Sequence, residues 1–342
     1  MINQLKKLKK TFFWDIFITN IFYHVYHFFW TYILNLKSKI LGIFWNFNKN
    51  DFFNLDKNDK LLISENEEFK SLAYKIAIDS KKIIPELKKE IFSEEYKKKL
   101  NKNNQAYAET PYSIDFYSKL NDELKKEIVS FASSERMITT ATKYMGVLPM
   151  ITRIQVSLNI PRKNSNLRSA MLWHKDVFGF KSLDFFMAVT DITDENGPFY
   201  CLEDKIKAGV FKSFPYSSSK TGERGKVSLE EFQEKFKDKK CIKLIGNSGN
   251  AIFIDSFSSY HRGGHCKSED RIIFRICYQT QDVIPKSYKR EKEFFIFDKS
   301  IKRSETKDIF KRYIFFNRPS FLMRYLSIII LKFFSIIEFK YK

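Results

Sequence analysis

The sequence predicts an α+β fold in which a helical first half precedes a β domain. From about residue 65 to 146, apolar side chains stand three and four positions apart among charged ones, which is the spacing of amphipathic helices. From Ile151 the pattern changes to short β-branched and aromatic runs separated by Gly, Pro, Asn and Asp, which is typical of strands. With 342 residues, of which 44% are apolar, the chain can bury a substantial core.

These changes of pattern divide the chain into four expected regions. They are a basic, aromatic, amphipathic segment, a helical region packing on the core, the β core, and a basic, aromatic C-terminal extension, over 1–50, 51–150, 151–285 and 286–342. Ser134 is predicted to N-cap a helix that ends near Tyr144, with Gly146 as its stop. Ser228 and Glu231 form a capping box that predicts a helical insert in the β core.

Residues 11–36 are predicted to form an amphipathic helix with a wide aromatic face. Polar residues recur there every three to five positions, so they form one narrow stripe on a helix, opposite Phe, Trp, Tyr and Ile. They also interrupt the apolar run, which argues against a signal anchor. Residues 320–342 are compatible with a similar stripe. Such basic, aromatic helices suit a membrane interface. Packing of the two ends on each other or on the domain, or dimerisation through them, is the alternative.

The net charge of +20 is concentrated at the ends of the chain, since residues 1–50 carry +6 and residues 301–342 carry +7. No nucleic-acid motif is present, so we expect no nucleic-acid partner. The four cysteines have neither metal-binding spacing nor the framework of a secreted domain. The cysteines therefore predict reduced thiols in a cytoplasmic protein. If the basic, aromatic ends bind a membrane, the protein would be peripheral to it. The cysteines are Cys201, Cys241, Cys266 and Cys277.

The stretch MLWHKDVFGF, residues 171–180, places His174 and Asp176 two positions apart in an otherwise apolar run. On a strand these two side chains point the same way, because side chains alternate with a period of two. Holding both near a core costs free energy unless they share a ligand, and a metal ion is the obvious candidate. The plainer interpretation of His174 is a core histidine with its hydrogen bonds satisfied. A zinc site would lack thiol neighbours.

A metal site needs further ligands, and the β core offers only two more histidines, His261 and His265. His261 follows the strand-like run AIFIDS and precedes two glycines, where backbone can approach a small ligand closely. Two histidines and one carboxylate on one face of an octahedron are the ligand set of non-haem Fe(II) oxygenases. His265 in place of His261 is the alternative register. His24 and His27 belong to the N-terminal segment.

A predicted strand carrying Arg271 and Arg275 begins ten residues after His261. A guanidinium group suits a carboxylate, because it donates paired, charge-assisted hydrogen bonds. The His-x-Asp pair alone is a weak signal. It becomes more specific when a distant His follows it, with an Arg ten residues further on, and all of them lie in predicted strands. The residues therefore predict a metal centre beside a site for an anionic co-substrate.

The region from about 107 to 285 resembles the phytanoyl-CoA dioxygenase family of Fe(II)/2-oxoglutarate oxygenases, which includes ectoine hydroxylase. The resemblance lies in KYMGVLP, in LWHKDVFGFKSLDFFMAVTDITDENGPF and in YHRGGHCKSEDRIIFRICYQ. It implies a double-stranded β-helix, that is, a cupin-like jelly roll. After the Gly-Pro turn the family usually continues into Pro-Gly-Ser-His-Arg, whereas this chain reads FYCLEDKIKAG. The family's substrate contacts therefore do not carry over.

The resemblance also implies roles for individual residues. His174, Asp176 and His261 would bind iron, and Arg271 would bind the distal carboxylate of 2-oxoglutarate. The tyrosine seven residues after Arg271 favours it over Arg275, which stays the alternative. Gln155 and Asn159 match the family strand that lines the co-substrate pocket. An acidic ligand, in place of the small residue of halogenating relatives, implies hydroxylation.

The function that we expect from the sequence is a 2-oxoglutarate-dependent dioxygenase that uses Fe(II) and O2 to hydroxylate an unactivated C–H bond. The substrate is a small molecule, a glycan or a lipid-linked compound. One alternative is a non-catalytic membrane-surface protein that keeps the β fold. Another is a metal-binding isomerase of the cupin type, which would not need Arg271.

Overall fold

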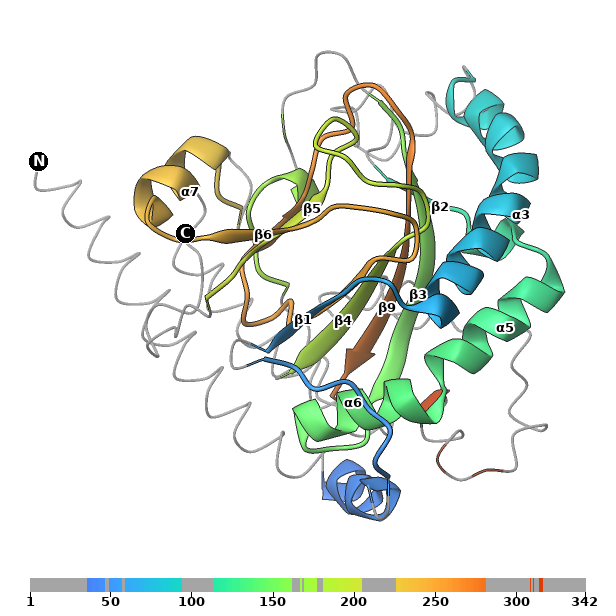
Figure 1. Ribbon diagram of the computed structural model, residues 1–342, viewed down its shortest axis with the longest axis vertical. Coiled ribbons are helices and arrows are strands. Elements are labelled where there is room, and N and C mark those ends of the chain that lie inside the picture. Colours follow the sequence, from blue (N-terminus) through green and yellow to red (C-terminus); the bar gives the residue numbers. More distant parts are fainter. Residues whose placement is uncertain are drawn as a thin grey trace, which may run out of the picture.

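The computed structural model describes residues 36–46, 49–56, 59–93, 113–161, 167, 169–176, 181–204, 226–280, 308, 310 and 314–315. Within these residues the chain forms two antiparallel sheets (Figure 1). The larger has six strands in the order β1-β7-β4-β9-β3-β2, with bounds β1 Lys60–Ile63, β2 Ile114–Asp115, β3 Met150–Asn159, β4 Ser182–Ala188, β7 Ala251–Ile254 and β9 Arg271–Gln279. The smaller has the order β6-β5-β8, with bounds β5 Phe199–Leu202, β6 Cys241–Leu244 and β8 His261–Gly263.

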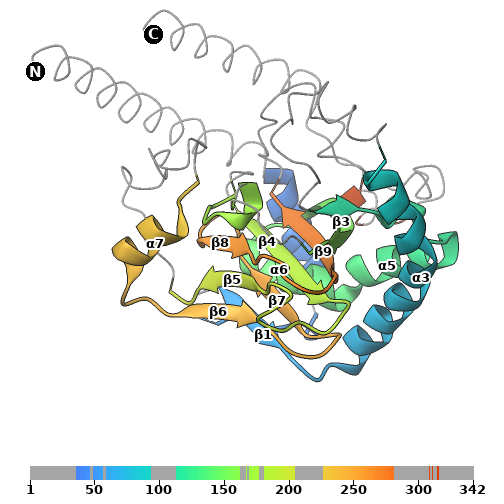
Figure 2. The same ribbon diagram turned by 90° about the horizontal axis from the view of Figure 1, so that it is seen from above.

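Helices cover one face of the six-stranded sheet, as Figures 1 and 2 show. They are α3 Glu67–Ile91, α5 Asp122–Ala132 and α6 Glu135–Met145, while α7 Leu229–Phe236 lies beside the smaller sheet. A further helix over 36–46 packs near α6, and the 3₁₀ turns η2 and η3 span Tyr117–Lys119 and Ser169–Met171. α3, α5 and α6 precede β3 to β9, so the change from mainly helices to mainly strands near residue 150 is confirmed for the described residues.

The predicted helix ends agree closely with the structure. α6 begins directly after Ser134 and ends at Gly146, which has a φ of 74°. Glycine suits this left-handed cap because it has no Cβ to clash. Ser134 makes no side-chain cap bond, however. The Ser228 hydroxyl accepts a bond from the Glu231 N–H, so the N-terminus of α7 is capped as predicted.

The six-stranded sheet has two chemically different faces, because side chains alternate along each strand. On β9, Ile272, Phe274, Ile276 and Tyr278 pack into the large core under the helices. The intervening positions face the other way, where side chains of both sheets form a second, smaller core. The members of that core are Phe186, Ala188, Ile192, Phe199, Cys201, Leu244, Ile252, Ile254 and Ile273. The two sheets therefore pack face to face, and this inner face carries the polar residues described below.

Two strands come from a region that the sequence indicated to be helical. β1 pairs with β7, and β2 pairs with β3, so both extend the six-stranded sheet from residues before 150. Most of residues 1–50 and 286–342 lie outside the described residues, as do His24 and His27. None of the helices that the structure describes combines the length and the apolar character needed to cross a bilayer.

Candidate metal centre

His174 and Asp176 lie just before β4, in a segment held to its neighbours by backbone hydrogen bonds. The His174 N–H donates to the carbonyl of His261 at 3.0 Å, and the His261 N–H returns a bond of 2.9 Å. The Asp176 N–H donates to the carbonyl of Ser256 at 2.9 Å. Segments almost 90 positions apart in the sequence are thus fixed side by side before any side-chain contact is considered.

His261 begins β8, and its side chain points to the inner face. Its register partner is Cys201, a member of the small core between the sheets, and its ring stacks on Phe199 at 5.7 Å between centroids. His174 and His261 have ring centroids 4.4 Å apart. Both rings are buried, with relative exposures of 6% and 4%. His174 and Asp176 lie outside the named strands, and it is the isolated bridge between His174 and His261 that holds these two rings together.

The potential ligand atoms of His174, Asp176 and His261 all lie within 4.8 Å of one another. The His174 Nε2 is 3.6 Å from one Asp176 carboxylate oxygen, and the His261 Nε2 is 3.8 Å from the other. These separations are longer than hydrogen bonds and suit three donors that surround one small cation. Among the described residues, this trio is the group of His, Cys, Asp and Glu that converges in this way.

The hydrogen bonds of the two rings orient their Nε2 atoms toward the centre of the trio. The His174 Nδ1–H donates to the Leu172 carbonyl at 2.8 Å, and the His261 Nδ1–H donates to the Ser259 carbonyl at 3.1 Å. Such bonds fix the tautomer in which Nε2 has a lone pair for a metal. Burial is the main cause that lowers the pKa of both histidines, that of His174 to about 3. Both rings are therefore neutral at physiological pH, the form that can bind a metal ion.

The Asp176 carboxylate is held ionised by its surroundings. Burial alone would raise its pKa, but His261 and His174, where they are protonated, and the Arg275 guanidinium outweigh burial and keep the pKa below its usual range. Two neutral imidazoles and one carboxylate match the donor set that holds Fe(II) on one face and leaves three positions open. The residues present therefore fit a divalent iron site.

Arg275 extends the site in a way that the sequence did not reveal. From β9 its Nη2 donates to Asp176 at 3.0 Å and to Asp184, on the neighbouring β4, at 2.9 Å. Its Nε donates to the second Asp184 oxygen at 3.3 Å, so the pair with Asp184 is bidentate. Asp184 is 1% exposed. One guanidinium group thus bridges a predicted metal ligand and a buried carboxylate.

Arg271 lies four residues before Arg275 on the same face of β9, about 13 Å away along the strand. It is buried, and its Nε and Nη2 donate to the Asn159 amide oxygen at 3.3 and 3.1 Å. Asn159 is its register partner on β3, and Gln155 is likewise opposite Arg275. The residues predicted to line a co-substrate pocket are therefore brought to one face. In the described part of the chain, His261 and not His265 groups with His174 and Asp176.

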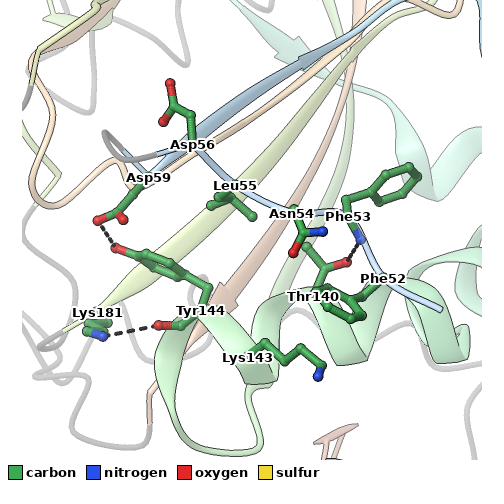
Figure 3. Close-up of a pocket in the computed structure, with 10 residues that line it drawn as sticks. All are labelled: Phe52, Phe53, Asn54, Leu55, Asp56, Asp59, Thr140, Lys143, Tyr144 and Lys181. Carbon is green, nitrogen blue, oxygen red and sulfur yellow. Dashed lines mark hydrogen bonds between the residues drawn. The ribbon is translucent and has the colours of Figure 1, made fainter. Parts of the chain in front are cut away.

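A pocket of about 470 Å³ lies outside the trio, between residues 52–56, Asp59, α6 and Lys181 (Figure 3). The Tyr144 hydroxyl lies on its wall and bonds to Asp59 at 3.2 Å and to Asp255 at 2.5 Å. Asp255 also accepts the N–H groups of Phe257 and Ser258 and so fixes the turn that leads to His261. Burial is the main cause that raises the pKa of Asp255. We assign this network a structural role.

Comparisons with known proteins give weak similarity in sequence and in structure. No family model matches the chain, and no curated protein does. Among solved structures, the chain is similar to EctD from S. alaskensis, crystallised with 2-oxoglutarate and 5-hydroxyectoine. The two are 14% identical, the match covers 66% of this chain and 73% of that one, and the TM-score is 0.42.

Two further solved structures are enzymes of nogalamycin biosynthesis. The non-haem α-ketoglutarate-dependent carbocyclase SnoK is 11% identical, with 70% of this chain and 90% of that one covered and a TM-score of 0.40. The epimerase SnoN, in complex with Fe³⁺ and α-ketoglutarate, is 14% identical, with 51% of this chain covered and a TM-score of 0.35. The match spans 65% of the SnoN chain. The descriptions of all three structures name 2-oxoglutarate, which is also called α-ketoglutarate.

Proposed function

We propose that the protein is an Fe(II)/2-oxoglutarate-dependent dioxygenase that hydroxylates an unactivated C–H bond. The observation that carries this proposal is the convergence of two neutral imidazoles and one ionised carboxylate on the inner face. His174, Asp176 and His261 would hold the iron, each through one donor atom. Three protein ligands leave positions for a chelating co-substrate and for O2.

Arg271 is the residue that we assign to the distal carboxylate of 2-oxoglutarate. Its guanidinium group is buried on the inner face, where charge-assisted bonds to an anion are strong. Arg275 is already engaged by Asp176 and Asp184, which supports Arg271 for the role. Asn159 would orient the Arg271 guanidinium through its amide oxygen, and Gln155 would line the same pocket from β3.

The chain's own residues would then perform three tasks. The backbone carbonyls of Leu172 and Ser259 fix the ligand histidines in one tautomer. Arg275 holds the Asp176 carboxylate and balances its charge. The apolar side chains of the inner core exclude water from the site. When bound, iron with 2-oxoglutarate and O2 supplies the oxidising power for hydroxylation, with succinate and CO2 as co-products.

The proposal includes the finer architecture expected from the sequence. We take the two face-to-face antiparallel sheets to be a double-stranded β-helix, with its core in residues 151–285 and residues 51–150 packed against it. The substrate is a small molecule, a glycan or a lipid-linked compound. The disagreement of FYCLEDKIKAG with the family pattern supports a substrate different from those of the better-known members.

Turnover of the co-substrate tests the proposal without knowledge of the substrate. Enzymes of this type convert 2-oxoglutarate to succinate slowly in the absence of their substrate, so succinate should appear only with Fe(II) and O2 both present. His174→Ala should abolish its formation, and His265→Ala, the matched control outside the trio, should retain it. Folded wild-type protein that forms no succinate and binds no 2-oxoglutarate would favour the non-catalytic alternative.

A further inference from the structure

The helix over 36–46 presents an apolar face to solvent. Leu36, Ile40, Ile43 and Phe44 have relative exposures of 59, 47, 63 and 67%. Their spacing is i, i+4, i+7 and i+8, which places all four on one side of a helix. Large apolar side chains gathered in this way are unusual on a protein surface that faces only water.

The opposite side of this helix is fixed to the protein. The Ser38 carbonyl accepts the Leu148 N–H at 2.9 Å, and the Trp45 Nε1–H donates to the Thr139 hydroxyl at 3.0 Å. A Cβ on Gly42 would lie 2.9 Å from the Leu148 nitrogen, so only glycine permits this close approach. The orientation of the helix, and hence the outward direction of its apolar face, is therefore determined by packing on α6 and the segment after it.

Lysines border the apolar face on both sides. With about 3.6 residues per turn, Lys37 follows Phe44 around the helix and Lys39 precedes Ile43. Both lysines are exposed, and residues 36–46 contain no acidic residue. Long basic side chains at the margin of an apolar stripe keep their charges at the level of lipid headgroups while the stripe enters the acyl region.

The geometry points to an anionic phospholipid surface as the partner of this face. We infer that the helix over 36–46 lies in the bilayer interface, with Leu36, Ile40, Ile43 and Phe44 among acyl chains and the two lysines at anionic headgroups. A second copy of the chain fits less well, since two such faces in contact would bring their bordering lysines together in a chain of net charge +20. The preceding residues 11–35 continue the same aromatic and aliphatic composition.

This inference goes beyond the proposed chemistry, because it names the surface and the four side chains by which the enzyme would meet a membrane. A hydroxylase held in this way would act on substrates that reach it from the membrane plane. That consequence rests on the proposed function, whereas the attachment itself does not.

The test uses the full-length chain with the exposed Cys241 replaced by serine, since the other three cysteines are buried. Phe44→Cys is labelled with an environment-sensitive fluorophore and mixed with vesicles of phosphatidylglycerol and phosphatidylcholine in equal amounts. We expect a blue-shifted, severalfold brighter emission that doxyl-labelled acyl chains quench. Tyr74→Cys on α3, an exposed aromatic position of similar accessibility, is the matched control and should not respond.

A flotation assay with the same vesicles provides the second measurement. The fourfold variant Leu36→Ser, Ile40→Ser, Ile43→Ser and Phe44→Ser should lower partitioning by about tenfold or more, given the apolar area withdrawn from lipid. Tyr74→Ser with Ile78→Ser should leave it unchanged. Vesicles of phosphatidylcholine alone should bind the wild type less.

Two results would overturn the inference. One is a label at position 44 that does not respond to anionic vesicles, or responds no more than the label at position 74. The other is self-association of the wild type in sedimentation that the fourfold variant abolishes, with no vesicle binding by either. Fe(II) and 2-oxoglutarate binding by the wild type and the variants is measured in parallel. Absence of that binding in the folded wild type, with attachment intact, would count against the proposed function alone.

Discussion

Replacing Arg275 with methionine removes the guanidinium group that bridges Asp176 and Asp184. Its Nη2 lies 3.0 and 2.9 Å from the two carboxylates, and the side chains of Arg275, Asp176 and Asp184 are 17, 14 and 1% exposed. Removing one partner of a buried ion pair costs about 3 to 5 kcal/mol, since the remaining charge stays buried without compensation. We expect a loss in the free energy of unfolding of this size for the metal-free protein at neutral pH.

Urea unfolding of the metal-free protein measures this loss. Arg136 offers a matched control, because it also contacts two carboxylates, those of Asp51 and Glu68, but all three side chains are at least 38% exposed. Arg136→Met should therefore cost less than about 1 kcal/mol. A double variant, Arg275→Met with Asp184→Leu, should recover part of the stability, because no uncompensated carboxylate remains on β4.

The pH dependence of the Arg275→Met loss gives a second check. In the wild type, the pKa of Asp176 is held below its usual range, so the ionised carboxylate stabilises the folded state at pH values above the ordinary pKa of an aspartate. This stabilisation is lost as the pH falls toward the pKa of Asp176 in the folded state. Without Arg275 this stabilisation is smaller, so the difference in free energy of unfolding between variant and wild type should become smaller in acid. If Arg275→Met and Arg136→Met cost the same small amount, the buried bridge has no special role in holding Asp176.

Three further predictions concern the co-substrate, the acidic ligand and the histidines. Arg271→Ala should raise the 2-oxoglutarate concentration that the enzyme requires by a factor corresponding to about 2 to 3 kcal/mol, with little change in iron affinity. If Arg271→Ala leaves this concentration unchanged and Arg275→Ala raises it by that factor instead, the assignment of Arg271 is wrong. Asp176→Ala should abolish turnover while circular dichroism reports an intact fold, since Arg275 keeps Asp184 as a partner; wild-type turnover would exclude Asp176 as a ligand. Burial lowers the pKa of His174 from 6.5 in the unfolded chain to about 3 in the folded, metal-free protein, so the unfolded chain binds more protons between these two pH values. His174 should therefore lower the free energy of unfolding by about 1.4 kcal/mol for each unit by which the pH falls in this range. His174→Gln should reduce the slope, while the contribution of His261 remains, and an unchanged slope would show that His174 does not contribute to it.

Local patterns were sufficient to predict most elements around the site. The change from helical spacing to strand runs was correct, as were the ends of α6 and the cap of α7. β1 was missed because four residues, KLLI, carry too little periodicity to distinguish a strand from a helix start. Its identity depends on pairing with β7, almost 200 residues later in the chain.

The site was predictable as a set of residue types but not as a set of contacts. The alternation of β9 indicates that Arg271 and Arg275 share a face, yet the choice between them depends on their partners. Asp176 and Asp184 lie 99 and 91 positions before Arg275, and no local pattern reports their proximity. A charged residue inside the apolar strand SLDFFMA was the available signal for Asp184.

We propose that His174, Asp176 and His261 together bind Fe(II) and leave room for 2-oxoglutarate. Anaerobic titration of the protein with Fe(II) and then 2-oxoglutarate tests it most directly, because chelation by the co-substrate gives a weak visible charge-transfer band. We predict this band for the wild type and for His265→Ala, and its absence for His174→Ala and His261→Ala. Properly folded wild-type protein without the band, or His174→Ala with it, would contradict the account.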